Sequence, residues 1–133
     1  MDAHGGWVTT AVDFLRFLTA VDGTRKPALL APDTYAQFIA QPLAGESAGT
    51  PVYYAKGVNV RPLGGAGANI WHSGSLPGTL SYAAKLARGW SYAAIFNKRP
   101  ENWEQTIAQI DRLLGAASRK ATAAAHGDLF EWF

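Results

Sequence analysis

The 133-residue sequence contains no cysteine, which excludes a disulfide framework, a thiolate zinc site and a cysteine nucleophile. No apolar run reaches the ~18 residues that a membrane-spanning helix requires. Lysine and arginine number 12 against 10 aspartates and glutamates, and this net charge of +2 lacks the clustered basic residues of a nucleic-acid-binding surface. We therefore predict no membrane span and no nucleic-acid partner. No signal-peptide pattern is visible, and the localisation stays open.

What the sequence does contain is typical of a folded chain. Hydrophobic residues make up 48% and charged residues 17% of it, which is too apolar for a disordered protein. This length fits one unit with a single core, and we predict one unit over residues 1–133.

Helical periodicity marks both ends of the sequence. Residues 10–13 form a capping-box pattern that opens a first helix, and Gly23 is its expected stop. A short second helix is predicted over residues 32–40. A long helix follows Pro100, with Gly115 as a candidate end or bend. The apolar faces expected for the first and last helices consist of Trp7, Ala11, Phe14, Leu15, Leu18 and Val21, and of Trp103, Ile107, Ile110, Leu113 and Leu114.

Between the helices the period changes from helical to alternating. The alternation predicts strands over residues 53–60, 69–73, 79–87 and 90–97. The predicted fold class is α+β: an antiparallel sheet of about four strands with N-terminal and C-terminal helices packed on it. The tail, residues 116–133, is expected to dock or to stay flexible, and docking is favoured by the four large apolar side chains within residues 128–133.

Residues 71–79 form the segment that most suggests chemistry, because two glycines, a proline and two serines interrupt a strand-like pattern there. Glycine in a strand often marks the close approach of a ligand or of another backbone. His72 and Ser73 are adjacent, so on a strand they point to opposite faces and cannot form a Ser–His dyad. The three histidines, His4, His72 and His126, lack the spacing of metal ligands, and we predict neither a metal nor a cofactor.

Several segments, taken in order, resemble the serine β-lactamase and penicillin-binding-protein-like hydrolases, in particular their class C-related, esterase-like branch. The triplet His72-Ser73-Gly74 resembles the third conserved box, which is often His-Ser-Gly in that branch and Lys-Thr-Gly elsewhere. Residues 5–17 resemble the family's Gly-Gly loop and following helix, and residues 53–60 resemble its Tyr-Gly-x-Gly-Trp strand. Residues 94–97 and 128–130 are similar to its final strand and its C-terminal ending.

The resemblance implies roles for the residues of this box. His72 would line the catalytic cleft and help to bind or polarise an ester, lactam or peptide substrate, with Ser73 directed towards the substrate or the general-base network. The backbone N–H of Ser75 would be one of two oxyanion-hole donors. Gly74 and Trp71 would contact the substrate. An unperturbed histidine, with a pKa of roughly 6.5, is mostly neutral at pH 7, so the resemblance favours an esterase or peptidase over an efficient β-lactamase.

The family's nucleophile does not occur in this sequence. Its serine lies in a Ser-x-x-Lys box, and its second box reads Tyr-x-Asn or Ser-x-Asn; neither spacing is present. Ser81 and Lys85 are one residue too far apart and are expected on the same exposed strand face. We therefore expect the C-terminal part of such a hydrolase, inactive alone. It would pair with the missing N-terminal part or associate with itself through the exposed face.

A non-enzymatic interpretation stays open beside this one. A helix–sheet–helix unit of this length can also be a small α+β module for ligand binding or dimerisation. A closed apolar pocket between the sheet and the helices, without an open cleft beside His72, would favour that alternative.

Overall fold

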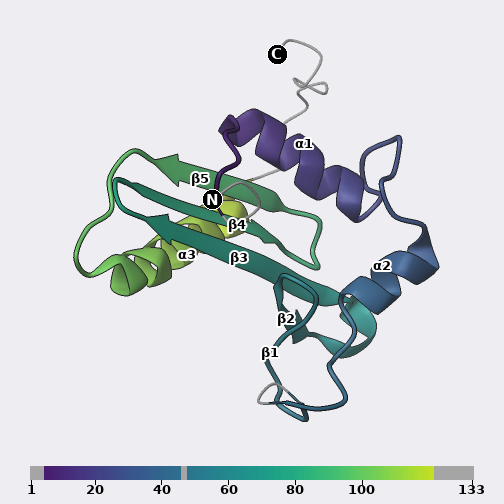
Figure 1. Ribbon diagram of the computed structural model, residues 1–133. Helices are drawn as coiled ribbons and strands as arrows, with labels where there is room; N and C mark the ends of the chain where they lie inside the picture. The colour runs from purple at the N-terminus through teal and green to yellow at the C-terminus, as the bar shows by residue number, and fades with distance from the viewer. Residues whose placement is uncertain (1–4, 46–47, 122–133) are drawn as a thin grey trace.

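The structure is a computed structural model that describes residues 5–45 and 48–121 (Figure 1). Within them a five-stranded antiparallel sheet is flanked by helices, which confirms the α+β class. His4, His126 and the docking predicted for residues 128–133 lie outside the described residues. The helices are α1 (Ala11–Val21), α2 (Pro32–Phe38) and α3 (Trp103–Lys120), and the strands are β1 (Tyr53–Tyr54), β2 (Asn59–Pro62), β3 (Ala68–Leu76), β4 (Thr79–Lys85) and β5 (Ser91–Phe96).

Each strand of the sheet pairs with the next along the chain, in the order β1-β2-β3-β4-β5. The longest register joins β3 to β4, from Ile70 opposite Lys85 to Leu76 opposite Thr79. Directly opposite residues of an antiparallel pair share a face, so this register sorts the whole sheet into two faces. Helix α1 covers the face of Ile70 and Lys85, and α3 covers the other face (Figure 1).

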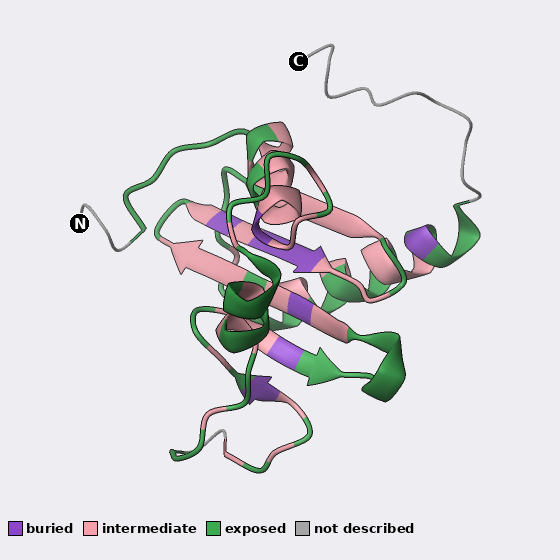
Figure 2. Cartoon of the chain, turned by 90° about the vertical axis from the view of Figure 1, so that its right-hand side faces the viewer, coloured by how far each residue is buried: buried purple, intermediate pink, exposed green. Residues whose placement is uncertain are grey.

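Strand β4 is the most deeply buried of the five, whereas on β3 only Ile70 is buried (Figure 2). On the α1 face, Tyr53, Val60 and Ile70 form a core against which Leu18 of α1 packs. On the α3 face Leu80, Tyr82 and Ala84 are buried, as their alternation predicts. Ala83, which points the opposite way, is also only 4% exposed. Because β4 is covered on both faces, the expectation that every second residue of a strand faces solvent does not hold for it.

The prediction of one strand over residues 53–60 was wrong. The chain instead turns back on itself, so that β1 and β2 pair as a hairpin with Tyr53 opposite Val60. Gly57 adopts a φ of +93°, which residues with a side chain rarely reach, and the Ala55 N–H donates to the Val58 carbonyl at 2.8 Å across the turn. This hairpin accounts for a sheet of five strands rather than about four.

Helix α1 begins at its expected cap, since the Asp13 backbone N–H donates to Thr10 Oγ1 at 3.1 Å. The expected stop, Gly23, follows the C-cap residue Asp22 and has a φ of +75°. The placement of Trp7 on the apolar face was wrong, because its side chain is 87% exposed. Trp7 precedes the first turn of α1, so the helical period does not govern where it points.

Helix α3 runs without interruption from Trp103 to Lys120, and so Gly115 does not end it. One glycine inside a helix costs only about 1 kcal/mol relative to alanine, which the contacts of an 18-residue helix easily offset. The predicted apolar stripe also extends too far, because Leu113 is 69% exposed. Ser118, in contrast, is buried and accepts a hydrogen bond from Arg88, which ties the turn after β4 to the end of α3.

The expectation that Lys85 lies on an exposed strand face was also wrong. Its ammonium forms an ion pair with Asp22, the residue that follows α1, and donates to Thr24 Oγ1 at 2.7 Å. The Asp22 side chain is only 2% exposed and that of Lys85 only 17%. Burial lowers the pKa of Lys85, and the adjacent carboxylate is what favours its charged form. The pair joins α1 to β4.

We expect Lys85→Met to destabilise the protein by about 3–5 kcal/mol, because it leaves the Asp22 carboxylate buried without its cation. The double variant Asp22→Asn/Lys85→Met should lose clearly less than the sum of the two single variants. Lys98→Met, which removes an exposed cation, serves as the matched control. Urea unfolding followed by circular dichroism measures the parent chain, the two single variants, the double variant and Lys98→Met, and equal losses for Lys85→Met and Lys98→Met would contradict a buried pair.

Candidate functional site

The box singled out by the sequence lies on β3, which runs from Ala68 to Leu76 and is therefore longer than the predicted strand over residues 69–73. The glycine and serines that were expected to interrupt the strand continue it. His72 pairs with Ala83 and shares the α1 face, whereas Ser73 pairs with Tyr82 on the α3 face. The prediction that these two neighbours point to opposite faces is confirmed.

One edge of β3 has no strand beside it along the box. Strand β2 pairs only with residues 68–71, the last of these being Trp71 opposite Asn59. Among the described strands, residues 72–76 pair with β4 alone. The segment before α1 passes the far end of this edge, since a Cβ atom on Gly5 would lie 2.7 Å from Leu76 Cδ1. Along residues 72–76, the main-chain N–H and C=O groups that point away from β4 therefore pair with no described strand.

His72 lies at this edge with its side chain exposed. Its Nε2 atom lies 3.1 Å from the Tyr54 hydroxyl, within hydrogen-bond distance, and the two rings are tilted with their centroids 5.9 Å apart. The sequence did not identify Tyr54 as this partner. Read as one strand, residues 53–60 put Tyr54 on a single strand face with Val60 and give no reason to place it near His72; the β1–β2 hairpin brings it beside β3.

Gly74 has a packing reason for lacking a side chain. A Cβ atom at this position would lie 2.6 Å from Ser81 Oγ on β4, its direct cross-strand partner. Real Cβ atoms do not approach other heavy atoms that closely, so either Ser81 or the strand must shift. The close contact at this glycine therefore comes from a side chain of the neighbouring strand, and not from a ligand or another backbone as the sequence led us to expect.

Ser75 points to the α3 face, opposite Leu80. Its hydroxyl oxygen is inaccessible to solvent and has no hydrogen-bond partner within the described part of the chain. A buried hydroxyl without a partner costs free energy. The side chains of Ser73 and Ser75 thus lie on the side of the sheet away from His72, so the three predicted catalytic residues do not converge through their side chains.

We expect Gly74→Ala to destabilise the protein by about 1 kcal/mol, because the added methyl group meets the Ser81 hydroxyl, which must rotate away. Ser81→Ala alone should cost less, and the double variant Gly74→Ala/Ser81→Ala should recover much of the loss, since the colliding oxygen is then absent. Thermal unfolding of the four proteins gives the coupling between the two sites. Strictly additive losses would show that the glycine is not required by Ser81.

On the α3 face a second polar cluster faces the same strands. The hydroxyls of Tyr82 and Tyr92 both donate to Asp111 Oδ1 of α3, at 2.7 and 3.0 Å. Burial, and next the Asp111 carboxylate, raise the pKa of Tyr92 to about 12. Burial also raises the pKa of Tyr82, and its hydrogen bond to Asp111 raises it further. Both phenols therefore stay protonated near neutral pH, and the cluster holds α3 on the sheet.

Trp71 belongs to this second face. It pairs with Ala84 of β4, and the Arg61 guanidinium of β2 lies over its ring, 5.3 Å from the centroid. A cation at that distance is attracted to the negative face of the ring. Trp71 thus lies across the sheet from His72.

Neither a metal centre nor a membrane span is found within residues 5–45 and 48–121. No three His, Asp or Glu side chains come together there as metal ligands would. None of the helices described in that part combines the length and apolar character needed to cross a bilayer. No family model, curated protein or solved structure matches the chain.

Proposed function

We propose that the chain supplies the cleft-forming sheet of a serine hydrolase of the β-lactamase and penicillin-binding-protein-like type, which acts on an ester, lactam or peptide by acyl transfer. The observation that carries the proposal is the edge of β3 at residues 72–76, where the His-Ser-Gly box borders space that no described strand fills. An extended substrate can hydrogen-bond along such an edge as an added strand.

Each residue of the box then has a role that fits its position. The exposed imidazole of His72, with the Tyr54 hydroxyl 3.1 Å away, can bind or polarise a substrate carbonyl from the α1 side of the edge. Ser73 and Ser75 contribute through their backbone groups, because their side chains point to the α3 face. The Ser75 N–H is the proposed oxyanion donor. The absent side chain of Gly74 leaves room for Ser81 of β4.

Acyl transfer also needs a nucleophile and a base, and neither Ser-x-x-Lys nor Tyr-x-Asn occurs in the 133 residues. In this proposal both come from a further polypeptide segment that packs beside the β3 edge, either as the N-terminal part of the same enzyme or as a separate chain. Other members of the resembled family carry a lysine where this chain has His72, and so we propose esters as the favoured substrates.

The chain alone should not react with a fluorophosphonate probe, because such probes label an activated serine and the sequence lacks the Ser-x-x-Lys spacing that would activate one. Mass spectrometry of the intact protein measures the adduct after overnight exposure, with Ser73→Ala and Ser75→Ala as comparison variants. Stoichiometric labelling of the parent chain that either substitution abolishes would overturn the view that the nucleophile lies elsewhere.

A chimera tests the proposal directly. An N-terminal segment that carries Ser-x-x-Lys and Tyr-x-Asn, taken from an esterase-like member of the family, is joined to the full chain. We expect it to hydrolyse p-nitrophenyl butyrate faster than nitrocefin. His72→Ala should lower kcat/KM for the ester by about 100-fold, a typical value for a lost acid–base or electrostatic contribution.

The control variant for the chimera is Arg99→Gln, which removes a surface cation far from β3 in sequence and should leave kcat/KM within twofold. Circular dichroism and the unfolding midpoint establish that each chimera is folded. A folded chimera whose ester hydrolysis does not depend on His72 would contradict the proposal.

A further inference from the structure

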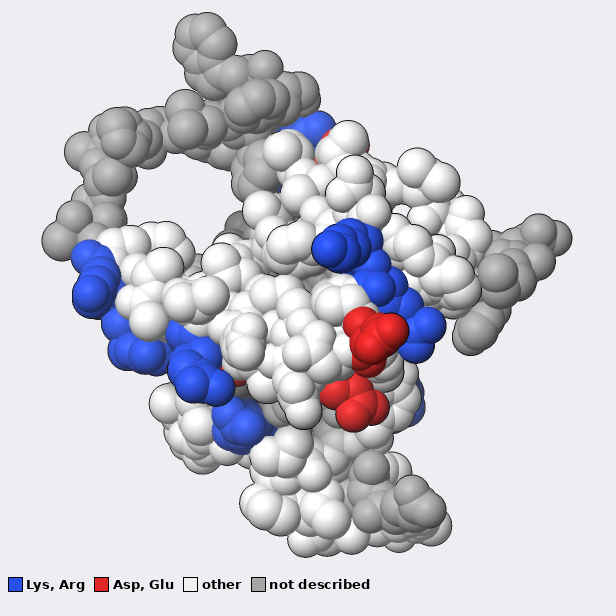
Figure 3. All heavy atoms as spheres, turned by 90° about the vertical axis from the view of Figure 1, so that its left-hand side faces the viewer, with Lys and Arg blue, Asp and Glu red and all other residues white. Residues whose placement is uncertain are grey.

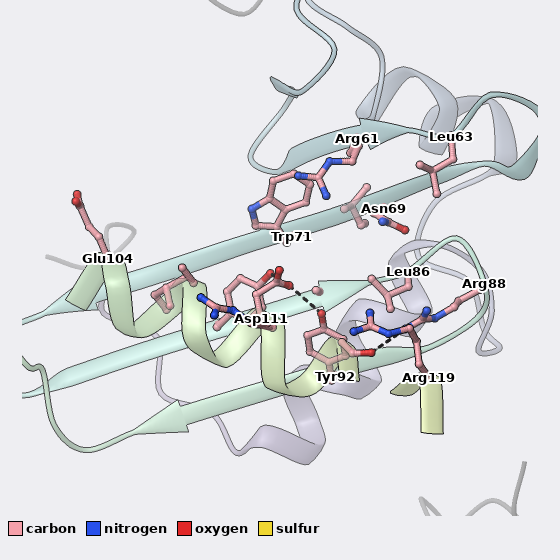
Figure 4. Close-up of a pocket in the computed structure, with 17 residues that line it drawn as sticks. Arg61, Leu63, Asn69, Trp71, Leu86, Arg88, Tyr92, Glu104, Asp111 and Arg119 are labelled. Carbon is pink, nitrogen blue, oxygen red and sulfur yellow. Dashed lines mark hydrogen bonds between the residues drawn. The ribbon is translucent and has the colours of Figure 1, made fainter. Parts of the chain in front are cut away.

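A pocket of about 650 Å³ lies between α3 and the sheet, on the face opposite His72 (Figure 4). Its lining comes from β2, β3, β4, β5 and α3. The floor is apolar and aromatic, with Trp71, Ala84 and Leu86 among its residues. This volume lies within the range of about 300–1,000 Å³ that small-molecule pockets occupy.

The charges around this pocket are unequal. Four arginines line it and two carboxylates, those of Glu104 and Asp111, accompany them. Asp111 already accepts hydrogen bonds from two tyrosine hydroxyls, and in Figure 4 Glu104 lies at the end of the pocket away from Arg88 and Arg119. Basic side chains also form a row along one side of the molecule in Figure 3, with little acidic surface among them. The pocket therefore favours an anion.

Two of the arginines are already engaged. Arg88 donates to the Gly115 carbonyl at 3.2 Å and to Ser118 Oγ, which fixes its guanidinium at the C-terminal half of α3. Arg61 lies over the Trp71 ring. These contacts shape the wall of the pocket and leave the recognition of a ligand to other groups.

The remaining two arginines, Arg112 and Arg119, are seven residues apart on α3. Seven residues are close to two helical turns, so both side chains lie along the same side of the helix and line the pocket together. Within the described part of the chain neither forms an ion pair. A guanidinium binds carboxylates and phosphates through paired N–H donors, which makes this pair suited to an anionic head group.

We propose that this pocket binds a small organic anion, with a flat apolar body against Trp71, Ala84 and Leu86 and a carboxylate or phosphate at Arg112 and Arg119. The flat body matches a floor in which an indole ring stands beside small and aliphatic side chains. The site is separate from the edge of β3, and it does not depend on the proposed hydrolase activity.

Isothermal titration of the full chain tests this with three naphthalene probes that differ in one substituent. 1-Naphthoate and 1-naphthyl phosphate are anionic, and neutral 1-naphthamide is the control. At least one anion should bind with a Kd at least tenfold lower than that of the amide. The anion with the lower Kd identifies whether the pocket prefers a carboxylate or a phosphate. Equal affinity for all three, or no binding of either anion, would overturn the proposal.

Variants locate the binding site. Arg112→Gln/Arg119→Gln should weaken binding of the anion at least tenfold and leave the weak binding of 1-naphthamide within twofold. Arg99→Gln removes the same type of charge outside the pocket and should change neither. In NMR spectra of the protein's backbone N–H groups, addition of the anion should shift the signals of β3, β4 and α3. Shifts confined to α1 and the His72 edge, or full affinity in the double variant, would contradict this site.

Discussion

The pairing of β3 with β4 is the constraint on which the rest of the structure depends. Its register, from Ile70 opposite Lys85 to Leu76 opposite Thr79, decides which residues face α1 and which face α3. A slip by one residue would move every side chain of one strand to the other face. Trp71 would then leave the arginine-lined pocket, and His72 would enter it. The separation of the two candidate sites is therefore a consequence of one antiparallel register.

The two faces hold their helices by different chemistry. On one face a buried ion pair between Lys85 and Asp22 ties the end of α1 to β4, beside an apolar core around Val60. On the other face two tyrosine hydroxyls converge on Asp111, which anchors α3 without filling the space next to β2 and β3. Polar contacts fix the position of α3, and the incomplete apolar packing beside them leaves the pocket open.

Local patterns in the sequence predicted more of the fold than of the site. The cap at Thr10, the stop at Gly23 and the inward-facing residues of β4 are properties of short segments, and they were correct, whereas Ala83 and Lys85 on the other face of β4 are not exposed as alternation predicts. The hairpin within residues 53–60 was not predicted, because the alternation of side chains in the sequence continues across its turn. The reversal of the chain is visible only in the structure, where Gly57 has a positive φ. That error concealed Tyr54 as the partner of His72. The close approach at Gly74 was expected, but its partner, Ser81, was not.

The sequence by itself determined the α+β class, the opposite orientations of His72 and Ser73, and the absence of a Ser-x-x-Lys spacing, since each depends on residues close together in the chain. Only the tertiary structure decided that Lys85 is buried against Asp22, that the edge of β3 is unpaired beyond Trp71, and that arginines from β2, the turn after β4 and α3 line one pocket. The physical reason is that periodicity sets the side of an element to which a residue points, whereas what covers that side is set by segments distant in sequence.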